Sequence, residues 1–231
     1  MAARFVSRKD ETVRLFKSDA LEFWSRVHFS VPLILYVPVT LWLLYLAWTG
    51  GALSAGAIAG LYIAGGLAWT LTEYIIHRFA FHFEPRSALG KRIFYLFHGI
   101  HHDYPNDSMR LVMPPAVSIP LAFLFYGGFL LVLGKPTVDP FFAGFLTGYL
   151  AYDMLHYAIH HAPWKTGIGL YLRQHHFRHH FQDSGSGFGV SSPLWDVVFR
   201  TMPAGGGPAA ATALPDPDAA AKETPAQGGP S

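Results

Sequence analysis

The stretch FFAGFLTGYLAYDMLHYAIHHA, residues 141–162, is apolar for most of its length and ends in a cluster of three histidines. About 20 apolar residues are enough for a helix to cross a bilayer. Three more runs of similar length cover residues 29–50, 52–74 and 111–134. Because a span cannot leave backbone polar groups unpaired in lipid, each run is predicted to be helical. The sequence therefore predicts an all-α membrane protein with four transmembrane helices.

The positive charges lie on one side of this predicted bundle. Of the 17 Lys and Arg residues, only Lys135 falls in the two short turns that join the first span to the second and the third to the fourth. Positive charge marks the cytoplasmic side of a membrane protein. We therefore expect a multi-pass protein with both termini in the cytoplasm and a helical cytoplasmic cap formed by residues 75–110 and 163–201.

The regions outside the spans divide the chain further. Residues 1–28 are expected to form a cytoplasmic segment in which residues 10–27 make an interfacial amphipathic helix. Residues 29–201 are expected to form one domain, and residues 202–231, rich in Ala, Gly and Pro, a disordered tail. No cleavable signal pattern is evident. A net charge of +2 gives no indication of a nucleic-acid partner, and the oligomeric state is not predicted.

Thirteen histidines and no cysteine are present, and twelve of the histidines fall into four tight clusters. The clusters lie at residues 77–82, 98–102, 156–161 and 175–180. Neutral imidazole is a common ligand of transition metals, and helical spacings of three and four residues place rings on one face. Every cluster also falls on the predicted cytoplasmic side. Charge bias and histidine position therefore agree on a single metal site.

The number of rings exceeds what one ion can use, so about five ligands for each of two ions fits the count. The absence of cysteine excludes iron–sulfur clusters and thiolate zinc, whereas iron, zinc and copper all accept imidazole. The lone His28 is expected to be an interfacial residue. Ring-orienting hydrogen bonds or structural roles are expected instead of ligation for a few neighbours of the ligand positions, namely Glu73, Asp153, His161 and His175.

Four motifs carry a family resemblance: HRFAFH at residues 77–82, HGIHHDYPNDSMRLVMPP at 98–115, YDMLHYAIHH at 152–161 and HHFRHHFQDSGSGFGVSSPLWDVVFRT at 175–201. The chain is similar to the fatty acid hydroxylase branch of the sterol desaturase superfamily of membrane di-iron oxygenases. The patterns HHxxPxDxxRLVxPP and GFGVSSPLWDxVF resemble the fatty acid 2-hydroxylases in particular. The resemblance implies ten metal ligands: His77, His82, His98, His101, His102, His156, His160, His176, His179 and His180.

The resemblance also implies O₂-dependent hydroxylation of a lipid acyl chain. The expected position is C2 of a fatty acid or of the N-acyl chain of a sphingolipid, which lies near the headgroup depth predicted for the histidines. Iron is expected for catalysis, and zinc is also able to occupy such a site. No haem or flavin is expected in this chain, and no Rossmann fingerprint is present. A separate cytochrome or ferredoxin with its reductase is therefore expected to supply electrons.

Alternatives from other classes remain open on the sequence alone. A carotenoid or sterol hydroxylase or desaturase of the same superfamily would share the metal chemistry and differ in the lipid. A non-enzymatic haem carrier would show a Soret band, and a metal-handling protein would spread its ligands through the bilayer. The Ala, Gly and Pro content favours a bacterial inner membrane, with the endoplasmic reticulum as the location in a eukaryote.

Overall fold

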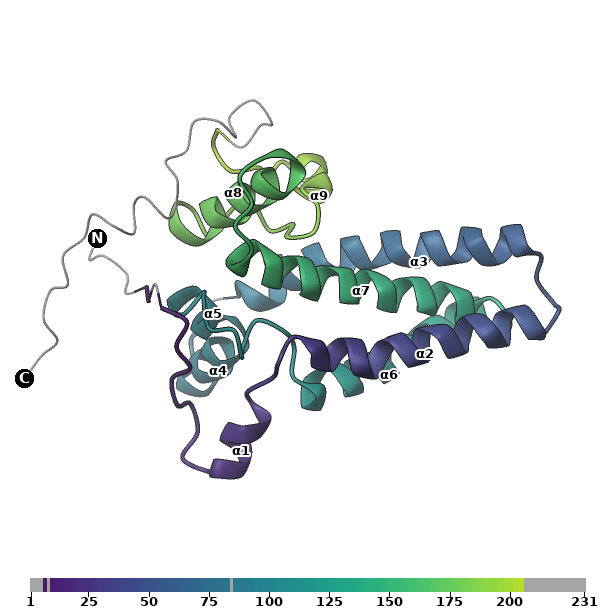
Figure 1. Cartoon of the computed structure of the whole chain (residues 1–231), viewed down its shortest axis with the longest axis horizontal. Coiled ribbons are helices and arrows are strands. Elements are labelled where there is room, and N and C mark those ends of the chain that lie inside the picture. The colour runs from purple at the N-terminus through teal and green to yellow at the C-terminus, as the bar shows by residue number, and fades with distance from the viewer. Residues whose placement is uncertain (1–5, 8, 84, 206–231) are drawn as a thin grey trace, which may run out of the picture.

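Four long helices form a bundle at one end of the molecule, and shorter helices gather at the other end as a cap (Figure 1). The computed structural model describes residues 6–7, 9–83 and 85–205, and within these ranges all regular structure is helical. The bundle consists of α2 (Ser30–Thr49), α3 (Ala55–Ile75), α6 (Pro115–Leu133) and α7 (Val138–His161). The cap contains α1 (Asp19–Trp24), η1 (Ile76–Phe81), α4 (Ala88–Phe94), η2 (Tyr95–Gly99), α5 (Ile100–Asp103), α8 (Gly167–Phe181) and α9 (Leu194–Val198).

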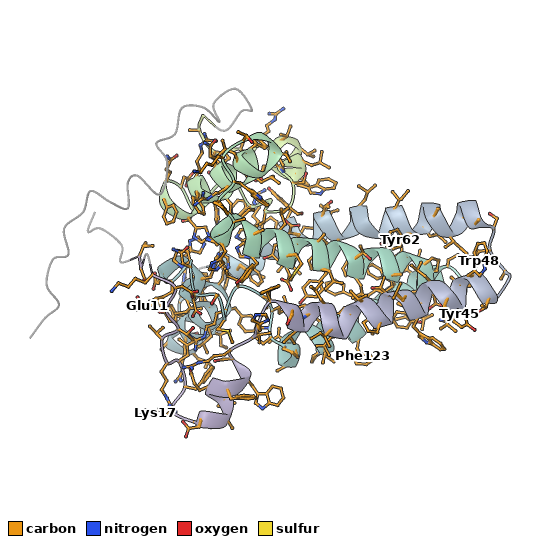
Figure 2. All side chains as sticks on the ribbon, in the orientation of Figure 1. Glu11, Lys17, Tyr45, Trp48, Tyr62 and Phe123 are labelled. Atoms are coloured by element: carbon orange, nitrogen blue, oxygen red, sulfur yellow. The ribbon has the colours of Figure 1, made fainter. Side chains whose placement is uncertain are left out.

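Three helices are long and apolar enough to cross a membrane: Ser30–Thr49, Ala55–Phe81 and Pro115–Leu133. Their outward faces expose large apolar side chains, and Phe123 of α6 is 74% exposed (Figure 2). Three of the four predicted spans are therefore confirmed by length and composition. The third begins later than predicted, because Pro114 is extended and Pro115 occupies the first helical turn, where its missing N–H is not needed.

The central helix α7 differs from the other three. It contacts α2, α3 and α6, and its side chains Phe142, Phe145 and Tyr149 form much of the bundle core. It also carries Asp139 and Asp153, both buried, among its apolar residues. A helix covered by other helices can hold polar groups that face protein instead of lipid. This helix coincides with the fourth predicted span, which stays a prediction.

Glycines allow α3 and α7 to approach closely. A Cβ atom added to Gly65 would lie 1.8 Å from the Phe141 carbonyl oxygen, and one added to Gly144 would lie 1.9 Å from the Tyr62 carbonyl oxygen. Small residues at such crossings let helix backbones touch inside membranes. The contact brings the cap end of α3, which continues into η1, toward the histidine-bearing end of α7.

The N-terminal helix is shorter than the range predicted for it. Instead of residues 10–27, α1 covers only six residues. The preceding chain is not helical because the Glu22 carboxylate accepts hydrogen bonds from the backbone N–H groups of Leu15 and Phe16, at 2.9 and 3.0 Å. Of the tail predicted to be disordered, residues 206–231 lie outside the described residues.

Candidate metal centre

The ten histidines predicted as ligands converge in the cap as two groups of five. Within each group the candidate ligand nitrogens all lie within 4.8 Å of one another. The first group contains His77, His82, His98, His102 and His179, and the second contains His101, His156, His160, His176 and His180. All of these side chains are buried except the half-buried His82.

Helical spacing explains how the ten rings divide between the two groups. The pairs at i and i+4, such as His176 and His180, fall in the same group, since four residues make about one turn. Adjacent residues point about 100° apart, and so His179 joins the first group while His180 joins the second. His101 and His102 divide in the same way. The two groups are therefore neighbours, with the His102 and His180 ring centroids 4.3 Å apart.

The five-residue spacing of His77 and His82 depends on a π-helical turn. In an α-helix, residues five apart would point about 140° away from each other. Here η1 continues α3, and the His82 N–H donates to the His77 carbonyl at 3.2 Å, an i to i+5 contact. Such turns often occur at functional sites. The turn brings both rings into the first group.

Burial favours the neutral form of several imidazoles in the two groups. It lowers the pKa of His98, His101, His176 and His180 well below the usual value, and neighbouring imidazoles lower it further. For His179, burial lowers the pKa to about 4, although its hydrogen bond to the Ser186 carbonyl opposes this. A neutral ring nitrogen without hydrogen is the form that binds a metal.

Two backbone carbonyls define which nitrogen faces the centre of the first group. The Nδ1 atom of His77 lies 2.5 Å from the Phe188 carbonyl oxygen, and that of His179 lies 2.7 Å from the Ser186 carbonyl oxygen. A carbonyl oxygen only accepts, so each Nδ1 carries the hydrogen and donates it. Each Nε2 atom consequently presents a lone pair to the other rings.

The spacing of these lone pairs fits a bound cation. In the first group, Nε2 of His77 lies 3.1 Å from that of His98 and 3.3 Å from that of His82. In the second, Nε2 of His176 lies 3.1 Å from that of His156 and 2.9 Å from that of His180. Nitrogen ligands at about 2.1 Å from a common ion, at the angles usual for such ions, lie about 3 Å apart. The all-imidazole donor sets therefore fit two ions of the iron, copper or zinc type.

The loop after α8 holds the two carbonyls in place through two buried carboxylates. Asp196 accepts from the backbone N–H groups of Phe188 and Gly189 at 2.9 and 2.8 Å. Glu73 accepts from the backbone N–H groups of Val190 and Ser191 at 2.7 and 2.8 Å. Glu73 therefore reaches His77 indirectly, through the loop that supplies the Phe188 carbonyl.

Asp196 was not among the residues that the sequence singled out. It is fully buried, and its Oδ2 atom lies 3.1 Å from Nε2 of His175. Burial raises the pKa of Asp196, but hydrogen bonds from His175 and Thr201 outweigh burial and hold the pKa below its usual value. Its position inside the otherwise apolar run LWDVV could have indicated a buried carboxylate with a structural role.

The remaining predicted neighbours lie near the ligands in different ways. His175 is fully buried against Asp196 and outside both groups. His161 stacks on Tyr157, with ring centroids 4.5 Å apart, and also lies outside both groups. Asp153 is buried in the wall of a neighbouring cavity.

That cavity has a volume of about 300 Å³ and touches both histidine groups, through His98 of the first and His101 of the second. Most of its other walls are apolar and include Phe81, Ile100 and Met113. No sequence pattern predicted this space. An apolar cavity that opens onto the candidate metal site is suited to hold a hydrocarbon chain against it.

Comparison with known proteins agrees with this geometry. The fatty acid hydroxylase family model matches residues 62–201. The chain belongs to the fatty acid hydroxylase family. This hydroxylase is 38% identical over 194 residues to a dihydroceramide fatty acyl 2-hydroxylase of Arabidopsis thaliana, a match that covers 84% of this chain and 81% of the relative. It is also 38% identical to the human fatty acid 2-hydroxylase, but it spans only 56% of that protein's length.

A solved structure supports the same assignment. The hydroxylase resembles full-length scs7p, of which only the hydroxylase domain is visible, with a TM-score of 0.76 and 34% sequence identity over 81% of this chain and 71% of that one. Family membership makes the protein an oxidoreductase that hydroxylates fatty acids. The resemblance inferred from the sequence motifs is therefore confirmed, and the carotenoid and sterol alternative is not favoured.

Proposed function

We propose that this hydroxylase inserts one oxygen atom from O₂ at C2 of a lipid acyl chain, either in a fatty acid or in the N-acyl chain of a sphingolipid. The observation that carries the proposal is the apolar cavity that touches both histidine groups at the cap end of the apolar helices. The names of the plant and human relatives, a dihydroceramide fatty acyl 2-hydroxylase and a fatty acid 2-hydroxylase, support the position and the substrate class.

The ten histidines of the two groups would hold two metal ions. We propose iron for catalysis, with zinc able to bind the same rings; bound iron would supply the activation of O₂. The chain itself orients the rings, through the carbonyls of Ser186 and Phe188, and encloses them away from bulk water. The cavity would place the target carbon beside His98 and His101.

The reaction needs two electrons and two protons from outside the substrate. One oxygen atom of O₂ enters the C–H bond, and the other leaves as water. We propose a separate electron-transfer protein, a cytochrome or a ferredoxin with its reductase, as the electron source. The positive residues around the cap, among them Arg86, Lys91 and Arg92, would give such a partner a charged surface to approach.

In the membrane, α7 would be the fourth span, and residues 29–201 would form one hydroxylase domain preceded by the segment 1–28. Lys and Arg residues flank the cap ends of the helices, whereas Lys135 lies at the opposite end. This distribution supports a cytoplasmic cap and cytoplasmic termini. A bacterial inner membrane is the proposed location, or the endoplasmic reticulum in a eukaryotic host.

Expression in a host that lacks 2-hydroxy lipids tests the proposal. Mass spectrometry of saponified fatty acids should show 2-hydroxy acids, and the new hydroxyl should carry ¹⁸O when ¹⁸O₂ is supplied. His101→Ala and His179→Ala should each abolish the product, and His28→Ala should leave it unchanged. Products hydroxylated elsewhere, or hydroxyl oxygen from water, would rule the proposal out.

A further inference from the structure

The N-terminal segment forms one wall of the cavity beside the histidine groups. We call residues 12–25 the strap; they include α1, which lies at the cap end and apart from the four long helices (Figure 1). The strap side chains Leu15, Phe16, Leu21 and Trp24 all line the cavity. The cavity therefore reaches from the candidate metal ligands to the strap.

A buried carboxylate fixes the strap to the rest of the cap. Glu22 is 5% exposed, and it accepts from Arg110 at 2.8 Å and from Arg26 at 2.9 Å, besides the two strap amides already described. Burial alone would raise the pKa of Glu22, but hydrogen bonds from Phe16, Leu15 and Arg26 lower it to about 2. At neutral pH the ion pair with Arg110 therefore holds the strap as a fixed wall.

The strap also marks the place where the cavity opens. Leu21 and Trp24 line the cavity and yet are 56% and 59% exposed, so they stand at its mouth. Ala116 and Val117, in the first turn of the candidate span α6, line the same cavity. The mouth therefore lies where the apolar helices meet the cap, at the depth where an acyl chain leaves the lipid leaflet.

The cavity is bounded by its walls and opens at the strap, where the exposed side chains of Leu21 and Trp24 line it. An acyl chain that is longer than the distance from the histidines to this mouth does not fit inside the cavity. With C2 at the histidines, a longer chain has to pass over Leu21 and Trp24, which are neighbours on one face of α1, and continue into the bilayer. The side chains at the mouth would then contact the middle of the chain.

We propose that the strap is the specificity wall of this hydroxylase, and that Leu21 and Trp24 decide whether acyl chains longer than the cavity are accepted. This inference rests on the proposed C2 hydroxylation of acyl chains. A single methylene in an apolar pocket changes the specificity constant by about 10-fold or more. A change in the mouth should therefore alter the chain lengths found in the product far more than it alters total hydroxylation.

The test uses the full chain in membranes, supplied with an equimolar mixture of saturated fatty acids that are shorter and longer than the cavity. Leu21→Trp should lower the ratio of long to short 2-hydroxy products by about 10-fold, and Trp24→Ala should raise it. Phe23→Trp is the matched control, because Phe23 lies on the same helix, is 70% exposed and does not line the cavity. Equal ratios for Leu21→Trp and Phe23→Trp would overturn the proposal.

Photolabelling separates this inference from the proposed reaction. A long fatty acid with a diazirine at mid-chain is bound to the holoprotein without an electron donor, and the sample is digested with trypsin after illumination. Label should appear in the peptide of residues 18–26, which lies between cleavage sites after Lys17 and Arg26. If that peptide is labelled but the membrane assay with an electron donor yields no 2-hydroxy product, the proposed reaction is refuted and the position of the strap beside the chain is not. Product without label on that peptide would refute the strap wall.

Discussion

If the two histidine groups bind two metal ions as proposed, replacement of Asp196 by Asn should release one ion and keep the other. The carboxylate accepts four hydrogen bonds: from Phe188 N–H, Gly189 N–H, Thr201 Oγ1 and the His175 ring. The loop that it holds carries the carbonyls that orient His77 and His179, and both of these rings belong to the first histidine group. The second group receives no carbonyl from this loop among the hydrogen bonds of the described residues.

The expected loss of stability and of metal affinity follows from the atoms that lose a hydrogen-bond partner. If Asn keeps Oδ1 toward Phe188 and Thr201, its amide NH₂ replaces Oδ2 and faces the Gly189 N–H as donor against donor. A buried donor left unsatisfied destabilises a protein by about 1–3 kcal/mol, and the lost charge-assisted bond from His175 adds a similar amount. Loss of support behind a metal ligand typically lowers metal affinity about 10–100-fold.

Metal content measured by mass spectrometry, during titration with a chelator, checks this expectation. The unchanged protein should release two ions over one range of chelator, whereas Asp196→Asn should release one of them at about 10–100-fold lower chelator concentration. Ser184→Ala is the control, since Ser184 lies in the same loop and is exposed. Loss of both ions together, or of neither, would show that the loop does not orient the first group.

Three further changes test the contacts that hold α3 against α7 and the strap against the cap. Gly65→Ala should lower the melting temperature and the yield of folded protein, because its Cβ would overlap the Phe141 carbonyl, while Gly60→Ala, which meets no atom within 4 Å, should change neither. Glu22→Gln should speed tryptic cleavage after Lys17 several-fold by weakening the strap's contact with Arg110, with metal content unchanged. The pKa of Glu22 is about 2 in the folded protein, against 4.5 in an unfolded chain. The strap should therefore be fully attached above pH ~4.5 and should detach as the pH falls toward 2. Faster hydrogen exchange of the Leu15 and Phe16 amides, which donate to Glu22, would measure this detachment.

The histidine groups were predictable because their signals are local. Spacings of four residues on a helix fix which rings share a face, and this rule places His98 with His102 and His156 with His160, as the structure has them. The division of adjacent rings, such as His179 and His180, between two groups depends on where α8 lies between its neighbours. That position is tertiary, and the sequence pattern does not contain it.

The features that were missed depend on contacts across long stretches of chain. Asp196 is linked to His77 through Phe188, whose N–H donates to Asp196 and whose carbonyl contacts the His77 ring, and the cavity takes one of its walls from the strap, which Glu22 joins to Arg110. Likewise, the helix predicted over residues 10–27 is short because Glu22 binds the amides that a longer helix would have used. In each case a side chain far from the motif decides the local structure.

The polarity of α7 follows from the same arrangement. Because α5 and α8 each supply rings to both groups, a rotation that improved one set of ligands would displace the other. The two sites therefore need a helix whose position is fixed. The helix α7 contacts both α2 and α3, is held close to α3 by the glycine contacts, and carries His156 and His160. A helix in that central position is shielded by its neighbours and can carry histidines and Asp153. It is accordingly less apolar than the three candidate spans around it, because its central position in the bundle buries its polar side chains.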